Sequence, residues 1–582
     1  MTPRDGFSAE VKPVEESRGW SFGPFELLPG RGLVRDDGVD VEIAAKPLAV
    51  LQHLVRHRER VVSRRELLEA IWPGVSVSDS ALTSVLRDLR RALGESGDEI
   101  RFVATYRGRG LRFRAPVRAV HLQSGASEWQ EAARHFERAL RALDLVSASR
   151  GQATGNDPHR ELRERGDLLV ALARARWAGG STDSARSAFL YAARVGRRTG
   201  DGQILAEAAL GYAGRTDVTP GVNREAVSLL EEALASLPGG DSALRAELLA
   251  RLGTESYYEV DPRRSDDLTR EAMAMAERIP DKGVLGYAIT ARHFVLQRPE
   301  VSPRERLALG ERVLSLFADE PPSDVLALAL QECLVDQLEL GDGDAFDHTF
   351  QHYQQVVAAL EQPFFLWLES VFAGMRTLLA GRVDEAERAA HASFELGQRI
   401  GSPNASLALA GQLFGIRREQ DRLAELLPIM DEMAADDGGL PVFRAGRAAV
   451  LAAAGPPERA RAALDAALAD ELDDFPRDQN WLATLGTLAP AVAAFGRASQ
   501  IELLVGQLAP YADRVIVVGQ GVTTHGAVSH HLGLLTAALG AREAADRHFD
   551  RAEAVHAQLR APLWLARTRR ARDLRTDGQI PG

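Results

Sequence analysis

Hydrophobic residues in the N-terminal fifth of the chain follow two periods, one typical of strands and one typical of helices. Short strands are indicated by Trp20, Phe22, Phe25 and Leu27 and, behind the turn dipeptide Asp37-Gly38, by Val39, Val41 and Ile43. Three later segments have apolar residues three or four positions apart, which predicts three helices. Their apolar faces are Leu48, Leu51, Leu54 and Val55; then Leu67, Leu68, Ile71 and Trp72; then Leu82, Val85, Leu86, Leu89 and Leu93.

Turn and capping residues delimit these helices. Ser63 and Glu66 form a predicted capping box for the second helix, Ser78 or Asp79 caps the third, and Gly94 ends it. The segments 101–106 and 111–115 are then expected to pair as a hairpin around a tip of sequence Arg-Gly-Arg-Gly. Strands, three helices and a hairpin, in that order, are the layout of a winged helix.

From Ser127 onward the chain is rich in alanine and leucine and has a helical pattern with a loose repeat. Helices with matching apolar faces can be anchored at Ala185, Ala226, Leu268, Leu307, Phe346, Ala386, Leu423, Ala460, Ile501 and Ala545. Their spacing of 37 to 44 residues predicts stacked helical hairpins, somewhat longer than tetratricopeptide repeats.

These patterns predict a mainly α protein in which an α+β winged helix-turn-helix precedes a tetratricopeptide-like α-solenoid. The expected boundaries are a disordered tail over 1–18, the winged helix over 19–118, a linker over 119–126, the repeats over 127–576 and a tail over 577–582.

Charge separates the two parts of the chain. The net charge is −12, yet residues 19–118 hold 17 basic and 13 acidic residues. A basic head on an acidic body is expected when only the head meets nucleic acid. One cysteine, no secretory signal and no apolar run of membrane-spanning length together predict a cytoplasmic protein outside the membrane.

The third helix carries the candidate chemistry. Opposite its leucines lie Thr83, Ser84, Arg87, Asp88, Arg90 and Arg91. Thr83, Arg87 and Arg90 form one row at helical spacing, and arginine can bind guanine bidentately in the major groove. The hairpin adds further arginines with no acidic residue between them, at Arg101, Arg107, Arg109, Arg112, Arg114 and Arg118. We expect Arg107, Arg109 and Arg112 to contact DNA from the wing.

The segment 22–117 resembles the winged-helix DNA-binding domain of OmpR/PhoB-type regulators, especially one-component members without a phosphoreceiver. The matching motifs are Val61-Val-Ser-Arg-Arg-Glu-Leu67, Ile71-Trp72, Ser78-Asp-Ser-Ala-Leu-Thr83, Leu89-Arg-Arg-Ala-Leu-Gly94 and Arg107-Gly-Arg-Gly-Leu-Arg-Phe113. The resemblance implies that the recognition helix holds Thr83, Ser84, Arg87, Arg90 and Arg91, that Trp72 and Thr105 contact the DNA backbone, and that Arg109 and Arg112 belong to the wing. Asp88 departs from an often basic position, and Leu111 from a usual tyrosine.

The segment 127–576 resembles the helical-repeat region of large MalT- and SARP-like bacterial regulators, which usually also carry an ATPase module. A Walker A loop needs a lysine after a glycine-rich turn, and Lys12, Lys46 and Lys282 all lack that context. No Gly-x-Ser-x-Gly or His-Glu-x-x-His motif occurs. We therefore expect no enzymatic activity, cofactor or catalytic metal.

Three weaker features remain open. His348 and His352 lie one helical turn apart, so they fit either a metal site or an exposed repeat surface. A histidine group at His525, His530 and His531 follows Gly519-Gln-Gly521, which suits either a pH or ligand role or a glycine-rich turn between repeats. The aromatic residues Tyr257, Tyr258, Phe364, Phe365, Trp367, Trp481 and Trp564 fit either a ligand groove or the core between helices.

Together these features predict a one-component transcription regulator that binds double-stranded DNA sequence-specifically. Its repeats are expected to bind a small-molecule effector, or RNA polymerase or another protein, and homo-oligomers are possible. The alternative is an adaptor whose repeats recruit a protein, with the winged helix used for protein contact or nonspecific DNA binding.

Overall fold

The computed structural model describes residues 18–23, 25–28, 32–35, 41, 43–58, 60–71, 79–95, 102–106, 109–115, 118–121, 124–149, 158–214, 221–435, 441–468, 472 and 475–576. The chain divides into two compact units, residues 1–127 and 128–582.

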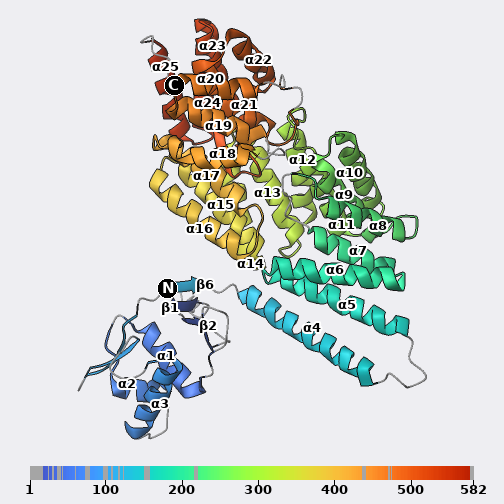
Figure 1. The fold of residues 1–582 in the computed structure, drawn as a ribbon, viewed down its shortest axis with the longest axis vertical. Coiled ribbons are helices and arrows are strands. Elements are labelled where there is room, and N and C mark those ends of the chain that lie inside the picture. Colours follow the sequence, from blue (N-terminus) through green and yellow to red (C-terminus); the bar gives the residue numbers. More distant parts are fainter. Residues whose placement is uncertain are drawn as a thin grey trace, which may run out of the picture. The chain divides into compact units, whose positions relative to one another are not determined.

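The first unit combines two small sheets with three helices (Figure 1). An antiparallel sheet of order β3-β2-β1-β6 contains β1 (Arg18–Phe22), β2 (Phe25–Leu28), β3 (Gly32–Arg35) and β6 (Arg118–His121). The helices are α1 (Ala45–Arg56), α2 (Arg64–Ile71) and α3 (Asp79–Ala92), and β4 (Val103–Tyr106) pairs with β5 (Gly110–Phe113). The segment 119–126, predicted as a linker, contains most of β6, because its backbone pairs with β1.

One hydrophobic core holds this unit together. The apolar faces predicted for the three helices point into it, and Leu51, Leu54, Leu67, Leu82 and Leu89 are fully buried. Four aromatic rings from the strands and loops complete it, with edge contacts among Phe22, Phe25, Phe102 and Phe113. The helical pattern of the sequence is confirmed here. The strand expected around Val41 and Ile43 is not, since both lie outside any strand and pack half-buried against the core.

Local signals mark the start of α2 and the end of α3, as predicted. The Ser63 hydroxyl accepts a hydrogen bond from the Glu66 N–H at 3.1 Å, which is one half of the capping box. The Glu66 carboxylate turns instead to Arg60, with Nη1 and Nη2 at 2.8 and 2.6 Å. After α3, Gly94 has a φ of +67°, and the Glu95 N–H donates to the Arg90 carbonyl at 2.8 Å. This is the helix end that a glycine permits.

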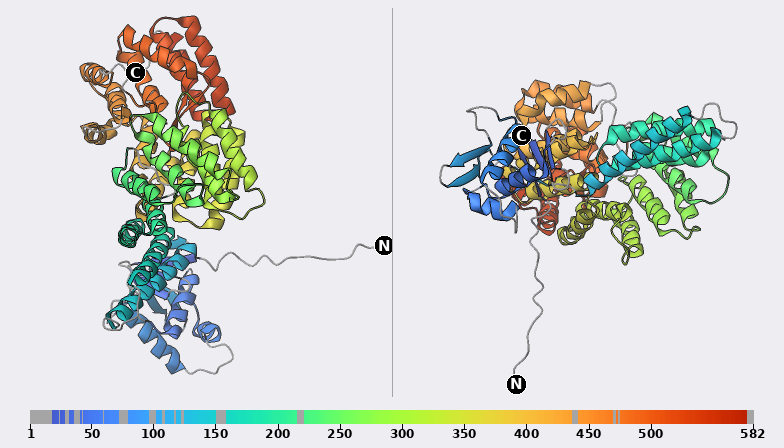
Figure 2. Two further views of the ribbon diagram at one scale, coloured as in Figure 1. Left: turned by 90° about the vertical axis from the view of Figure 1, so that its right-hand side faces the viewer. Right: turned by 90° about the horizontal axis from the view of Figure 1, so that it is seen from below.

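The second unit is a stack of helical hairpins (Figures 1 and 2). Its first helices are α4 (Ser124–Ser149), α5 (Pro158–Ala178), α6 (Thr182–Thr199), α7 (Gly202–Ala213), α8 (Arg224–Ser236), α9 (Ala243–Glu255), η1 (Ser256–Tyr258), α10 (Pro262–Ala276), α11 (Lys282–Val295), α12 (Pro303–Leu316) and α13 (Asp324–Glu339). The next are α14 (Gly343–Leu360), α15 (Pro363–Leu379), α16 (Val383–Arg399), α17 (Ala405–Glu419), η2 (Leu423–Leu426), α18 (Leu427–Ala435), α19 (Pro441–Ala454) and α20 (Pro457–Ala467). The last are α21 (Trp481–Phe495), α22 (Ala498–Leu508), η3 (Ala509–Tyr511), α23 (Val528–Ala538), α24 (Arg542–Gln558) and α25 (Pro562–Thr576).

The forty-residue period matches the order of these helices. Nine of the ten predicted anchors fall on even-numbered helices from α6 to α24, and Leu423 falls on η2, directly before α18. Sequential helices pack against each other, as α5 does with α6 and α15 with α16. Small residues allow the close approach, since Ala185, Ala226 and Ala460 are fully buried. The tetratricopeptide-like repeat architecture is therefore confirmed. Within the described part of the chain, no helix is long and apolar enough to cross a membrane.

A β-hairpin interrupts the helices where a turn between repeats was one of the expectations. Strand β7 (Val515–Val518) pairs antiparallel with β8 (Thr523–Ala527) around a turn that contains Gly519 and Gly521. Both glycines have positive φ, at +56° and +84°. His525 lies on β8, while His530 and His531 lie on α23, and all three side chains are buried.

The buried histidines are hydrogen-bonded in their neutral forms. The Ala527 N–H donates to His556 Nε2 at 2.8 Å, so this ring nitrogen carries no proton. The Thr568 hydroxyl lies 3.1 Å from His556 Nδ1 and 2.9 Å from His530 Nδ1, so it bridges the two rings by hydrogen bonds. Burial, reinforced by neighbouring charged groups, lowers the pKa of His531 to about 4 and that of His556 to about 3.

These depressed pKa values predict that acid destabilises the second unit. Because each histidine is neutral when folded, its contribution is complete above the unfolded pKa of about 6.5 and is lost as the pH falls toward 4 and 3. The free energy of unfolding should fall by about 1.4 kcal/mol per pH unit for each such histidine. Hydrogen exchange of α23 to α25, measured between pH 7 and pH 5, would show this slope.

His556→Gln should reduce that slope by the contribution of one histidine. The matched control is His348→Gln, because His348 is exposed on α14. Equal slopes for the two variants would contradict the assignment of His556 as a neutral buried group.

Candidate nucleic-acid interface

The outward face of α3 presents polar side chains to solvent. Thr83, Arg87 and Arg91 are exposed, and Ser84 and Asp88 are half-exposed. Arg87 Nη2 donates to Ser84 Oγ at 3.1 Å, and Arg91 Nη1 lies 3.5 Å from Asp88 Oδ1. Exposed ion pairs of this kind contribute little to stability, so both guanidinium groups remain available to an incoming anion or base edge.

The side chain of Arg90 bonds to the hairpin. Its Nη2 donates to the Val103 carbonyl at 3.0 Å and to Thr105 Oγ1 at 2.9 Å. Both acceptors lie on β4, so the guanidinium points from α3 toward the hairpin. The helical spacing placed Arg90 beside Arg87 correctly, but the length of the side chain lets it reach the strand.

Glu95, which the sequence analysis did not single out, completes this connection. Its carboxylate is almost fully buried, with 3% of the side chain exposed. Glu95 Oε1 accepts the N–H groups of Phe102 at 2.5 Å and Val103 at 3.3 Å, and Oε2 lies 3.8 Å from Arg90 Nε. The end of α3 is therefore joined to the start of β4 through one carboxylate and one guanidinium.

The β4–β5 hairpin is the wing. The hairpin was predicted, and its register pairs Thr105 with Leu111 and Tyr106 with Gly110, so that Gly110 belongs to β5 and not to the tip. Thr105 and Arg109 are exposed, whereas Arg112 is half-buried and donates from Nε to the Arg58 carbonyl at 3.2 Å. Two predicted contact residues, Trp72 and Arg107, lie outside the described residues.

A two-way backbone bridge fixes the wing to the rest of the unit. Val62 and Leu111 exchange both N–H···O bonds at 2.8 Å, which attaches β5 to the segment between α1 and α2. Gly110 has a φ of +134°, and a Cβ there would lie only 2.0 Å from the Val62 carbonyl oxygen. Only glycine fits at this point of the hairpin.

The wing, α3 and the bridge match a known domain. A family model described as "Transcriptional regulatory protein, C terminal" matches residues 38–113. Residues 38–113 are an OmpR/PhoB-type winged helix. The chain thus contains the DNA-binding domain of transcriptional regulators.

Relatives share this domain and little beyond it. The transcriptional regulator HilA of Salmonella typhi is 38% identical over 105 residues, which are 18% of this chain and 18% of HilA. The phosphate regulon protein PhoB of Pseudomonas aeruginosa is 37% identical over 111 residues, which are 19% of this chain and 45% of PhoB. The chain therefore spans less than half the length of either relative.

A solved structure with tetratricopeptide repeats aligns with most of the chain. It is a signal-transduction ATPase with a tetratricopeptide repeat sensor from Pyrococcus horikoshii, and the alignment covers 80% of this chain and 62% of that one. The identity is 12% and the TM-score 0.28. So low a score carries no weight, and the repeat architecture follows from the helical hairpins themselves.

Possible metal ligands come together at one place in the described residues, within the winged helix. His53, His57 and Glu66 can bring one ligand atom each within 4.8 Å of one another. The Arg60 guanidinium, however, binds both oxygens of Glu66 and holds the pKa of this carboxyl at about 2. Arg60 already neutralises the carboxylate, which leaves an ion-pair cluster. His348 and His352 are exposed on α14 and belong to no such group.

Substitution of Gly110 should loosen the wing. Gly110→Ala places a methyl group against the Val62 carbonyl, so we expect a loss of about 2 to 4 kcal/mol in the stability of this unit. Gly94→Ala is the control, because Gly94 also has a positive φ but a Cβ there meets nothing within 4 Å. It should lose only about 1 kcal/mol. Hydrogen exchange over residues 102–115 of the full chain measures both losses, and equal losses would show that the Val62 contact does not restrict this position.

Arg90 and Arg87 should respond differently to removal of their charge. Arg90→Met removes the donor to β4 and leaves Glu95 without its cation, so the opening free energy of residues 102–106 should fall by about 1 to 3 kcal/mol and their exchange should become faster. Arg87→Met removes an exposed group of the same size and should leave exchange unchanged. Unaltered exchange in Arg90→Met would contradict a positioning role for Arg90.

Proposed function

We propose that the chain is a sequence-specific DNA-binding transcription regulator, acting in the cytoplasm, whose helical repeats receive the controlling signal. The observation that carries this proposal is the exposed face of recognition helix α3 beside an arginine-bearing wing on an OmpR/PhoB-type domain. A regulator is favoured over an enzyme because Thr83, Arg87 and Arg91 are exposed on α3, where such side chains can reach base edges and phosphates.

Within this proposal the predicted contact residues take separate roles. Thr83 and Arg87 are the base-facing side chains, since both are exposed on α3. Arg91 and Arg109 are exposed cations suited to phosphate contact. Arg90 acts by positioning, because it is bonded to β4, and Thr105 is the strand residue that it holds.

The repeats are proposed to control the head. They form a separate compact unit of about 450 residues, and stacked helical hairpins create extended inner surfaces suited to ligands or proteins. A small-molecule effector, RNA polymerase or another protein remains the candidate partner, and self-association through this unit is compatible with tandem DNA sites.

DNA binding supplies the test. In genome-wide footprinting the intact protein should protect a defined set of sites. Arg87→Ala should relax base preference at one position, with a loss of about 1 to 3 kcal/mol for the preferred base. Arg109→Ala should weaken binding to all sequences alike and reduce the salt slope by about one unit.

The control is Arg160→Ala, which removes an exposed arginine from α5 in the second unit. It should leave both base preference and salt slope unchanged. If the intact protein binds all sequences equally, with affinity set only by salt, the specific-regulator proposal fails and the adaptor alternative is favoured.

A further inference from the structure

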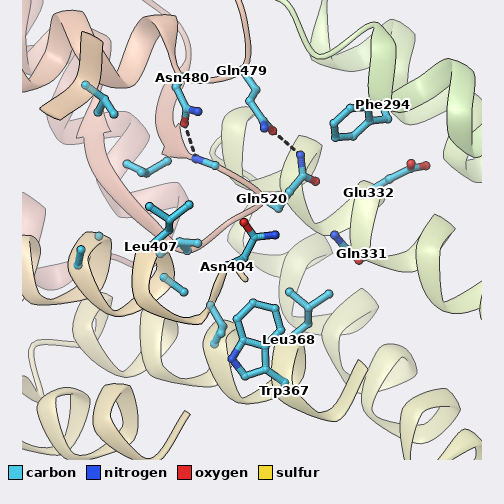
Figure 3. A pocket seen from close by; sticks show the side chains of 18 of the residues that line it. Phe294, Gln331, Glu332, Trp367, Leu368, Asn404, Leu407, Gln479, Asn480 and Gln520 are labelled. Carbon is cyan, nitrogen blue, oxygen red and sulfur yellow. Dashed lines mark hydrogen bonds between the residues drawn. The ribbon is translucent and has the colours of Figure 1, made fainter. Parts of the chain in front are cut away.

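The inner helices of the second unit enclose a cavity of about 210 Å³ (Figure 3). Its wall is built mainly from odd-numbered helices, α9, α11, α13, α15, α17 and α19, while the even-numbered helices carry the repeat anchors. The β7–β8 turn, with Gly519, Gln520 and Val522, closes one side. Residues from Arg251 to His525 thus meet around one space, although they are far apart in sequence.

Most of the wall is apolar. Trp367 and Leu368 from α15 lie on one side of the cavity, Leu407 from α17 beside them, and Phe294 from α11 across from them (Figure 3). Trp367 is buried, and its indole Nε1 faces Gly397 instead of the cavity, since a Cβ on that glycine would lie 2.7 Å from it. The ring therefore offers the cavity a flat hydrocarbon surface, which suits a ring-shaped or aliphatic body.

The wall offers no free cation among the described residues. Arg251 is buried, paired with Glu255, and donates to the Ala213 carbonyl at 2.7 Å. Burial raises the pKa of Glu332 well above its usual range and lowers that of His525 well below. Glu332 Oε2 also lies 3.5 Å from His293 Nδ1. An anionic occupant would therefore be desolvated without a counter-cation, which is strongly unfavourable.

Several amide groups beside the β7–β8 turn are bonded to one another or to the backbone. Gln520 donates from Nε2 to Gln297 Oε1 at 2.5 Å and to Gln479 Oε1, and Asn480 Oδ1 accepts the Gly519 N–H at 3.0 Å. Gln331 on α13 is 94% buried, and its Oε1 has no hydrogen-bond partner within the described structure. A buried amide oxygen without a partner is unfavourable until something donates to it.

We propose that this cavity binds a neutral, largely apolar small molecule that places its apolar body against Trp367 and Leu407 and donates one hydrogen bond to Gln331. An apolar cavity of about 150 Å³ accommodates benzene, so the volume here suits a compact molecule of one or two rings. The inference deepens the proposed control by the repeats, because it names the site and the class of effector.

1-Naphthylamine is a suitable probe, because it has two rings, is uncharged at neutral pH and donates a hydrogen bond from its amino group. Its fluorescence should change on titration with the full chain in the absence of DNA. The anionic analogue 5-aminonaphthalene-1-sulfonate should bind at least about tenfold more weakly, since its sulfonate finds no free cation. Tighter binding of the anion than of the neutral probe would overturn the stated ligand class.

Two variants locate the site, each with a matched control. Leu407→Trp fills the cavity and should reduce affinity by about tenfold or more, whereas Leu145→Trp, at a position 73% exposed on α4, should not. Gln331→Leu removes the acceptor and should reduce affinity by about fivefold, whereas Gln351→Leu, exposed on α14, should not. Circular dichroism confirms that each variant is folded.

Equal probe affinities for Leu407→Trp and Leu145→Trp would overturn the assignment of the cavity. The assay contains no DNA, so its failure is separate from failure of the regulator proposal. If the chain binds the probe but protects no DNA site, the regulator proposal fails and the ligand site stands. If it protects DNA sites but does not bind the probe, the ligand site fails and the regulator proposal stands.

Discussion

The carboxylate of Glu95 is the point on which the DNA-binding surface depends. It is buried at the end of α3, accepts the backbone N–H groups of Phe102 and Val103, and faces the Arg90 guanidinium. Away from water each of these bonds is stronger, and loss of one partner leaves another unsatisfied. The end of α3 and the start of β4 are thus joined through buried polar contacts. In the proposed function, this fixes the helix and the hairpin relative to each other before DNA binds, which reduces the entropy lost on binding.

Buried polar hydrogen bonds also hold the β7–β8 hairpin, the non-helical part of the repeat unit. The β7–β8 turn has no helix of its own to hold it, yet Gln520 bonds to Gln297, which is 223 residues away in sequence, and to Gln479. Behind the hairpin, Thr568 links His530 to His556, and His556 accepts the N–H of Ala527. Satisfied polar networks of this kind select one arrangement among the many that packed alanine and leucine faces would allow.

The features that could be predicted from the sequence are local ones. Leucine spacing placed the three helices, Ser63 marked the start of α2, and the recurrence of apolar helices gave the repeat period, because each signal depends on neighbours along the chain. The bonds of Arg90 to β4 could not be predicted, because Val103 and Thr105 are brought to its guanidinium only by the tertiary fold. The β7–β8 hairpin had a signal in Val515 to Val518 followed by two glycines, but the helical context on both sides outweighed it. Cavities and buried histidines are tertiary, so composition alone left them open.

A neutral occupant of the cavity can influence the repeat unit only through contacts that differ between the filled and empty forms. We expect such differences at the β7–β8 turn, since this part of the wall is held by side-chain amides and not by a helical backbone. An occupant beneath the turn makes dispersion contacts with those atoms of the turn that face empty space when the cavity is unfilled. It also gives Gln331 the donor that it lacks. The contacts with the turn would favour the arrangement in which Gln520 bridges Gln297 and Gln479. For an effector of the proposed class, the repeats would therefore respond through the order of this hairpin and not through a change of charge.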